Sequence, residues 1–339
     1  MAEIAADQLT AAARALMLAG RWAQAAGLID GAVAGGPDER AVLAVTRAEV
    51  AVDQDFWCRT DLGSAALQQA SATVAEAARD PSTDFDLELL RLKHDYAAEL
   101  FGPGDAPRFG PEGHDVPVID DLASRAERLQ AAAPDRGRAA AAMFYAGLIE
   151  DNLRGDGVTA RSTFAAALTA AEEAGEELTV SEALRHLGYH ASEAGDADQA
   201  RQMWERSEEQ RQRAGAVPYV LSQQLLLAGL ARDSGDPDTA RCVARQVRRW
   251  ACALGVGLLE SQAAELADGR LRGAAGHVEQ VVEDPVEGVH GHRQVTVTRH
   301  QVGAGALDVR GQPLAVRERD HPVLVALPDG DRRRVAGRR

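Results

Sequence analysis

The sequence has few aromatic residues and many small hydrophobic ones. Phe, Trp and Tyr make up 4% of the 339 residues, although hydrophobic residues make up 45%. A core of this composition has to be built mainly from Ala and Leu, whose side chains favour helices and allow them to approach closely. Helix-on-helix packing is therefore the expected use of this chain.

The sequence also predicts no leader, no membrane span and no cysteine pair. The N-terminus, MAEIAADQLT, has neither a basic nor an apolar region, and no apolar run approaches the ~18 residues of a span. Cys58, Cys242 and Cys252 form no C-x-x-C pair, so we expect small buried thiols in a reducing compartment. Lys93 is the only lysine among 37 basic residues, which indicates a GC-rich, actinobacterial-type genome. We expect a cytoplasmic bacterial protein.

No motif for catalysis or cofactor binding is found. A Walker loop, a G-x-S-x-G elbow and a G-x-G-x-x-G after a strand are all missing. His186 and His190 have the i, i+4 spacing of two metal ligands, and Glu193 follows three residues later. The segment reads HLGYH rather than HExxH, so no general base lies between the histidines. We interpret them as surface or groove residues and expect no metal, no cofactor and no enzymatic activity.

The net charge is −15 and is unevenly distributed. The segment from residue 270 to the end contains 12 Arg and 9 acidic residues, so the preceding part of the chain is the more acidic. An acidic body disfavours nucleic acid and anionic membranes and favours basic or apolar partners. The same charge is also accounted for by solubility alone.

A 40-residue periodicity is the clearest pattern in the sequence. Glycine recurs at Gly155, Gly195 and Gly235, where it permits a tight turn between helices. Further columns keep the same step: Ala160, Ala200 and Ala240; Phe164, Trp204 and Ala244; Ala167, Ser207 and Val247. Several columns in one register predict a stack of similar helical hairpins.

The segment Leu187–Ser207, LGYHASEAGDADQARQMWERS, resembles the core of a tetratricopeptide repeat. Gly188 follows a Leu and precedes Gly195, Ala200 and Trp204 in that pattern. The first unit, residues 6–37, is similar, with Gly20 at the turn, Ala25 at the close helix contact and Pro37 at the end. The resemblance implies an all-α superhelix of five to six hairpins over residues 1–270.

Two stretches depart from this pattern. Residues 38–80 form a degenerate unit whose helices, about 39–52 and 62–79, are joined by a long link, DQDFWCRTD. Residues 102–117 are rich in Gly and Pro and form an inserted loop. That loop is either a lid or binding loop carrying Arg108, Phe109 and His114, or a tolerated surface insertion.

The tail, residues 271–339, differs in character. Parts of it alternate apolar and polar residues in the manner of strands. It is interpretable as a β-hairpin cap, as a disordered basic tail, or as a segment out of frame beyond about Gly269. His290–His292 is weak evidence for a metal site because it lies in this tail. Arg332–Arg334 is weak evidence for a nucleic-acid site because a terminal run of charges is usually solvated.

The resemblance implies a partner-binding concave face lined by the first helix of each hairpin. The residues that match its positions are Tyr145, Ile149, Asn152, Glu182, Arg185, Tyr189, Ser192, Leu225 and Arg232. A strip of aromatic, amide and arginine side chains suits a peptide, and the alternative is that these are ordinary exposed helix residues. Self-association stays open.

We therefore predict a scaffold or adaptor that binds a peptide or helix of another protein, and neither nucleic acid nor membrane. The alternative is a regulatory sensor for a peptide or small ligand, similar to the repeat halves of bacterial transcriptional regulators. An enzyme is a third reading, and only the pair His186 and His190 supports it.

Overall fold

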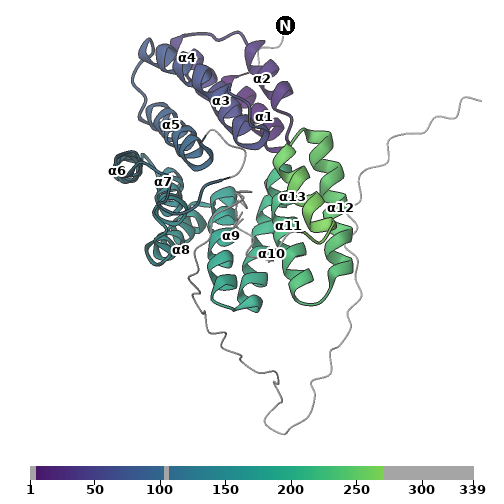
Figure 1. The fold of residues 1–339 in the computed structure, drawn as a ribbon. Coiled ribbons are helices and arrows are strands. Elements are labelled where there is room, and N and C mark those ends of the chain that lie inside the picture. The colour runs from purple at the N-terminus through teal and green to yellow at the C-terminus, as the bar shows by residue number, and fades with distance from the viewer. Residues whose placement is uncertain (1–4, 103–106, 271–339) are drawn as a thin grey trace, which may run out of the picture. The chain divides into compact units, whose positions relative to one another are not determined.

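The computed structural model describes residues 5–102 and 107–270, and over these residues the protein is entirely helical (Figure 1). The tail, with the hairpin, disorder and reading-frame interpretations placed on it, lies outside the described residues. The described part contains thirteen α-helices, one π-helical turn (η1) and no strand. Their bounds are α1 Ala6–Leu18, α2 Trp22–Asp30, α3 Pro37–Cys58, α4 Gly63–Ala75, α5 Pro81–Phe101, α6 Val116–Ala132, α7 Arg136–Leu148, η1 Ile149–Arg154, α8 Gly157–Ala174, α9 Glu177–Glu193, α10 Ala197–Arg213, α11 Val217–Asp233, α12 Pro237–Leu254 and α13 Gly257–Ala267.

The helices form six consecutive hairpins, α1–α2 to α11–α12, followed by α13. Each odd-numbered helix from α3 onward also packs against the hairpin before it, which makes the array continuous. This arrangement confirms the predicted all-α repeat superhelix. None of the described helices has the length and apolar character needed to cross a membrane.

The turns explain why the second half is regular. Glycines with positive φ recur every 20 residues, so all helices from α8 to α12 have nearly the same length. These glycines are Gly155, Gly175, Gly195, Gly215, Gly235 and Gly255, with φ between +68° and +94°. A positive φ is sterically easy only for glycine, so the residue type fixes where each helix ends.

In the regular second half, an aspartate fixes the start of α8, α10 and α12. Asp156, Asp196 and Asp236 each accept a hydrogen bond of 3.0 Å from the backbone N–H three residues later. Such a bond satisfies one of the amide groups that a helix leaves unpaired at its N-terminus. Cap and glycine together thus repeat the same turn at a 40-residue step.

Close helix contacts account for the buried columns. Trp204 is fully buried, and its Nε1 donates to the Arg185 carbonyl at 2.9 Å. A Cβ atom on Gly188 would lie 2.5 Å from Trp204 Nε1, and one on Gly147 would lie 2.6 Å from Phe164. Glycine is therefore required there for the large ring to fit. The small residues of the columns are also at most 1% exposed: Ala25, Ala160, Ala200, Ala240 and Ala244.

The link expected after residue 52 is largely helical. Helix α3 continues to Cys58, because Phe56 and Trp57 extend its apolar face into the core. Asp55 then accepts hydrogen bonds from the backbone N–H groups of Leu62 and Gly63, at 2.9 and 2.6 Å, and so starts α4. The short turn that remains includes Arg59 at φ +55°.

The first hairpin packs against the last part of the array. One hydrophobic cluster joins Met17 and Trp22 to Leu221, Leu225 and Leu259. Helix α3 contacts α13 directly, and the turn between α1 and α2 lies near α12, where a Cβ atom on Gly20 would be 3.1 Å from Leu254. The described helices therefore curve until their two ends meet, and the first helices of the hairpins line a partly open inner face. The expectation of buried thiols is wrong for two cysteines, since Cys242 and Cys252 are exposed.

Candidate binding cavity

The inner face of the superhelix contains a cavity of about 620 Å³. Its wall draws mainly on the first helices of the hairpins and on the final helix, namely α1, α3, α5, α7, α9, α11 and α13, and Arg211 of α10 also contributes. Ligand sites in proteins commonly have volumes of 300–1,000 Å³. The cavity is thus a suitable size for a small molecule or a few residues of a peptide.

Four of the nine residues predicted for the binding strip line this cavity. Tyr145 is on α7, Asn152 is in η1, and Glu182 and Arg185 are on α9. The structure brings them together because the hairpins place successive first helices side by side. Their role in binding stays a prediction.

The other five residues of the predicted strip do not line the cavity. Ile149 is fully buried and Leu225 is 7% exposed, and both belong to the hydrophobic core. Tyr189, Ser192 and Arg232 lie near the far end of α9 and α11, away from the cavity wall. The strip predicted from the repeat register therefore runs off the cavity at the C-terminal ends of these helices.

An aspartate marks the place where the two ends of the array meet. Asp53 on α3 accepts a hydrogen bond of 2.7 Å from Trp22 Nε1 and one of 2.9 Å from the Tyr219 hydroxyl on α11. Burial raises the pKa of Asp53 to about 6, and the two hydrogen bonds partly oppose that rise. A carboxyl group with this pKa changes its charge near neutral pH.

The inner wall also carries a cluster of cations around one acid. Burial is the main cause that raises the pKa of Glu182, and the charges of Arg211, Lys93 and Arg185 oppose it. Burial and the neighbouring Arg211 lower the pKa of Arg185 to about 9, and burial lowers that of Arg211 to about 10. Three cations from three helices therefore act electrostatically on one carboxylate.

Aromatic rings form much of the remaining wall. Tyr96 and Tyr145 contact each other edge to face, with ring centroids 5.7 Å apart, and Trp57 and Tyr219 do the same at 4.9 Å. Asn152 Nδ2 donates to the Tyr96 hydroxyl at 2.6 Å, which holds that ring in place. The wall thus combines charged groups with apolar rings, as ligand sites commonly do.

The inserted loop contributes to the wall and is tied to the core. Pro107 and Phe109 line the cavity. Arg108 donates to the Glu99 carbonyl at 2.7 Å, and His114 Nδ1 lies 2.6 Å from Glu99 Oε1. Of the three loop residues singled out in the sequence, Phe109 faces the cavity, whereas Arg108 and His114 anchor the loop.

The π-helical turn explains that anchoring. Between α7 and α8 the backbone hydrogen bonds change from the α-helical to the π-helical pattern at Ile149–Arg154. In this turn the Asn152 carbonyl accepts a hydrogen bond of 2.9 Å from the Gly110 amide. A π-turn widens the helix by one residue and is common at functional sites. Here it presents both the carbonyl and the side chain of Asn152 to neighbouring segments.

The two histidines of HLGYH, predicted to be surface or groove residues, differ: His186 lines the cavity, whereas His190 is buried and is therefore not a surface residue. His186 stacks on Phe164 with centroids 4.8 Å apart, and His190 is 7% exposed. Asp151 lies 3.6 Å from His186 Nδ1 and 3.2 Å from His190 Nε2. Within the described residues, no group of three or more His, Cys, Asp or Glu has a metal-binding arrangement.

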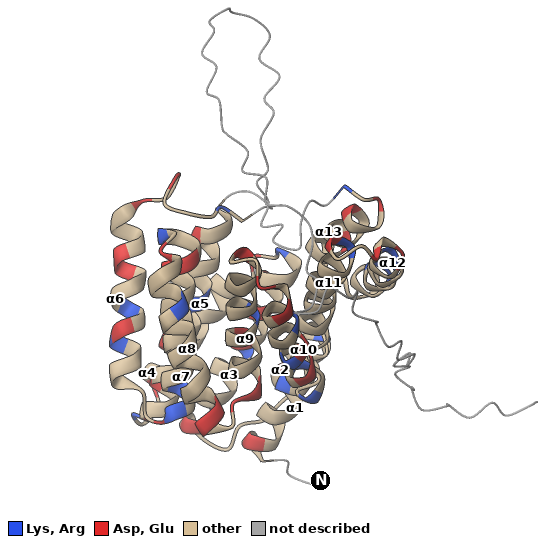
Figure 2. Ribbon diagram, turned by 90° about the horizontal axis from the view of Figure 1, so that it is seen from below, with Lys and Arg blue, Asp and Glu red and all other residues tan. Residues whose placement is uncertain are grey.

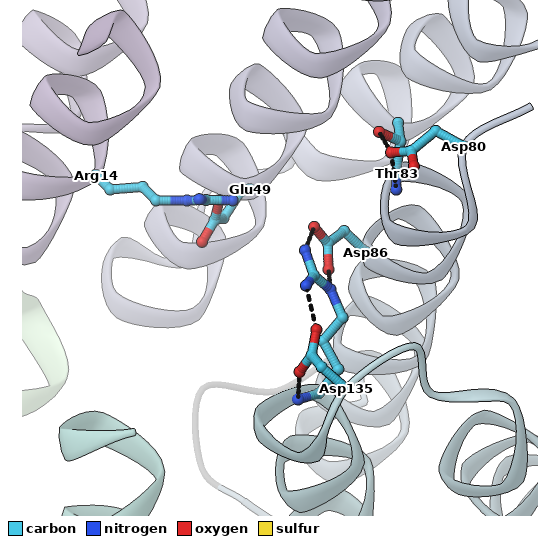
Figure 3. A network of polar contacts seen from close by, with 7 residues as sticks. Arg14, Glu49, Asp80, Thr83, Asp86 and Asp135 are labelled. Carbon is cyan, nitrogen blue, oxygen red and sulfur yellow. Dashed lines mark hydrogen bonds and ion pairs between the residues drawn. The ribbon is translucent and has the colours of Figure 1, made fainter. Parts of the chain in front are cut away.

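A second, smaller cavity of about 320 Å³ is surrounded by ion pairs (Figure 3). Arg138 donates to both carboxylate oxygens of Asp86, at 2.6 and 2.7 Å, and to Asp135 at 2.6 Å. Arg14 donates to Glu49 at 2.7 Å. These charges are already paired and tie α5 to α7 and α1 to α3, so we assign them a structural role.

Several residues of the larger cavity were missed in the sequence. Asp53 and Trp57 fall in the segment interpreted as a link, and Arg211 and Tyr219 lie outside the positions that the repeat register assigns to the groove. Lys93 carried a signal, because it is the only lysine of the chain. Its rarity is a feature of the composition, however, and does not predict that Lys93 lies at the cavity.

Comparisons with known proteins add no assignment. A scan against protein-family models finds no match for this chain, and a search among curated proteins also finds none.

Proposed function

We propose that this protein is a ligand receptor, and that the cavity enclosed by the first helices binds a small molecule or a short peptide segment. The observation that carries the proposal is the cavity itself, about 620 Å³, whose lining includes charged and aromatic side chains from six helices. A binding-induced shift between hairpins would then report the ligand, as in the sensor predicted above. The tetratricopeptide resemblance supports this use of the concave face.

The size of the cavity favours a compact ligand over a long partner helix. A scaffold that binds a helix needs an open groove, whereas Met17 and Trp22 pack here against Leu221 and Leu259 and join the two ends of the array. A partner protein would therefore be bound through a terminus or short loop. The bacterial source, the cytoplasmic location, self-association and the lack of enzymatic activity stay predictions.

Two tyrosines on neighbouring first helices give a matched test. Tyr145 lines the cavity, whereas Tyr189 does not. In a screen of short peptides and small molecules by isothermal titration calorimetry, we expect Tyr145→Ala to weaken a bound ligand at least tenfold. Tyr189→Ala should leave its affinity within twofold. The reverse order would place the site outside the cavity.

A further inference from the structure

The positive charge of the cavity lining is concentrated in one part of its wall. Lys93 on α5, Arg185 on α9 and Arg211 on α10 face two acids, Asp53 and Glu182. On exposed helices such as α6, by contrast, acidic and basic residues are interspersed (Figure 2). A buried excess of one sign is costly unless a group of the opposite sign is bound.

Two further acids of the lining are already used within the fold. Glu49 accepts a hydrogen bond of 2.7 Å from Arg14 Nε. Asp55 accepts the amide groups at the start of α4. Asp61 is exposed, and Arg59 lies over the Phe101 ring at 3.2 Å. The lining as a whole therefore holds five acids and four cations, and its positive charge is concentrated at Lys93, Arg185 and Arg211.

Arg185 retains strong donors for a ligand. Its Nη1 makes two long contacts, 3.5 Å to the Ser222 carbonyl and 3.4 Å to Gln223 Oε1. Its Nε and Nη2 have no hydrogen-bond partner in the described residues. Arg211 differs, because its Nη1 donates to the Tyr219 carbonyl at 2.8 Å. Arg185 is thus the guanidinium that is available to an anion.

Lys93 is available in the same way. Its ammonium lies 5.4 Å from the Tyr145 ring centroid, and no acid of the described residues is within 4.0 Å of it. A cation over an aromatic face is attracted to the ring and keeps its hydrogen-bond donors. Lys93 from one part of the array and Arg185 from another therefore both present donors to the cavity.

We infer that the ligand is a small organic anion, with one carboxylate or similar oxyanion bound by Arg185 and Lys93 and an apolar or aromatic body against Tyr145 and Tyr219. This inference rests on the proposed function. One negative charge would balance three cations and two acids. The lowered pKa of Arg185 is consistent with a site that lacks its counter-charge. The anionic group has two sources, the C-terminus of a peptide or a free organic acid.

A pair of fluorescent dyes tests the charge requirement on the full chain. 8-Anilino-1-naphthalenesulfonate and N-phenyl-1-naphthylamine share one aromatic body, and only the first carries a sulfonate. We expect the sulfonate dye to bind at least tenfold more tightly. Arg185→Gln and Lys93→Gln should each remove that preference while affinity for the neutral dye stays within twofold. Arg249→Gln, at an exposed position on α12, should change neither affinity.

The outcomes separate the two proposals. Equal affinity of the wild-type protein for both dyes, or an unchanged preference in both variants, would overturn the anion inference and leave the receptor proposal standing. Binding of neither dye would contradict both. Circular dichroism and thermal unfolding of each variant establish that it is folded before its affinity is compared.

Displacement then identifies the source of the anion. The probes are the dipeptide N-acetyl-Leu-Phe as free acid, the same dipeptide as amide, and 3-phenylpropionate. Displacement of the sulfonate dye by the peptide acid alone supports a peptide C-terminus, and displacement by both acids supports a free organic acid. Equal displacement by the amide would overturn the inference.

Discussion

The regular half of the array, from α7 to α12, and the irregular half, from α1 to α6, form one wall by different means. In the regular half the turns recur every 20 residues; a glycine lies at each of them, and an aspartate caps the helix that follows every second one. In the irregular half the helices vary from 9 to 22 residues, and specific polar contacts such as Asp55 to Gly63 set their ends. The cavity takes residues from both halves, so regularity of the repeat is not a guide to where the site lies.

The largest expected effect lies in the regular half. Trp204→Ala removes a fully buried ring and should lower the free energy of unfolding by about 3–5 kcal/mol. Trp250→Ala, at a position that is 43% exposed, should lower it by less than about 1 kcal/mol. Urea unfolding followed by circular dichroism measures both. Similar losses of unfolding free energy for the two variants would mean that Trp204 is not part of the core.

Two glycine substitutions contrast the halves directly. Gly188→Ala in α9 would place a Cβ 2.5 Å from Trp204 and should cost about 1–3 kcal/mol through overpacking. Gly27→Ala in α2 meets no atom within 4 Å and should stabilise the protein by up to about 1 kcal/mol through helix propensity. The same urea titrations compare them, and a stabilising Gly188→Ala would refute the close contact in the regular half.

The contact between the two halves is measurable as a coupling energy. Tyr219 donates to Asp53 at 2.9 Å across the closure. A double-mutant cycle of Asp53→Ala and Tyr219→Phe should give a coupling of about 1–2 kcal/mol, as for a buried hydrogen bond to a charged acceptor. Additive effects would indicate that the ends of the array do not meet.

Asp53 at the closure also gives a pH dependence. Burial raises the pKa of Asp53 from 3.8 to about 6, so the folded protein holds this proton more tightly than the unfolded chain. Its favourable contribution is complete below about pH 4 and is lost as pH rises through 6. The difference in unfolding free energy between wild type and Asp53→Asn should change over that range. Asp198→Asn, exposed on α10, should show no such change, and a constant Asp53→Asn difference would reject the raised pKa.

The periodic part of the fold was predictable because each column has a local physical cause. Gly195 permits the turn, and the step of 40 residues repeats it. The extent of α3 was not predictable from the local pattern, because Phe56 and Trp57 are helical only through packing against distant helices. The same dependence on tertiary contacts hides Asp53, whose neighbour Tyr219 is 166 residues away in the sequence.

The sequence predicted only part of the cavity lining, because the rest also depends on tertiary structure. The register identified Tyr145 and Arg185 because first helices stack in order. It could not show where along each helix the cavity ends, which depends on the curvature of the whole array. Leu225 and Ile149 accordingly lie in the core.

The central claim is that both halves form one binding cavity. Hydrogen–deuterium exchange of the full chain, read by mass spectrometry with and without saturating 8-anilino-1-naphthalenesulfonate, tests it most directly. We predict slower amide exchange on binding in α3 and α5 and also in α7, α9 and α11, with α6, α8 and α12 unchanged. Slower exchange in only one half, or only in the outer helices, would contradict the account.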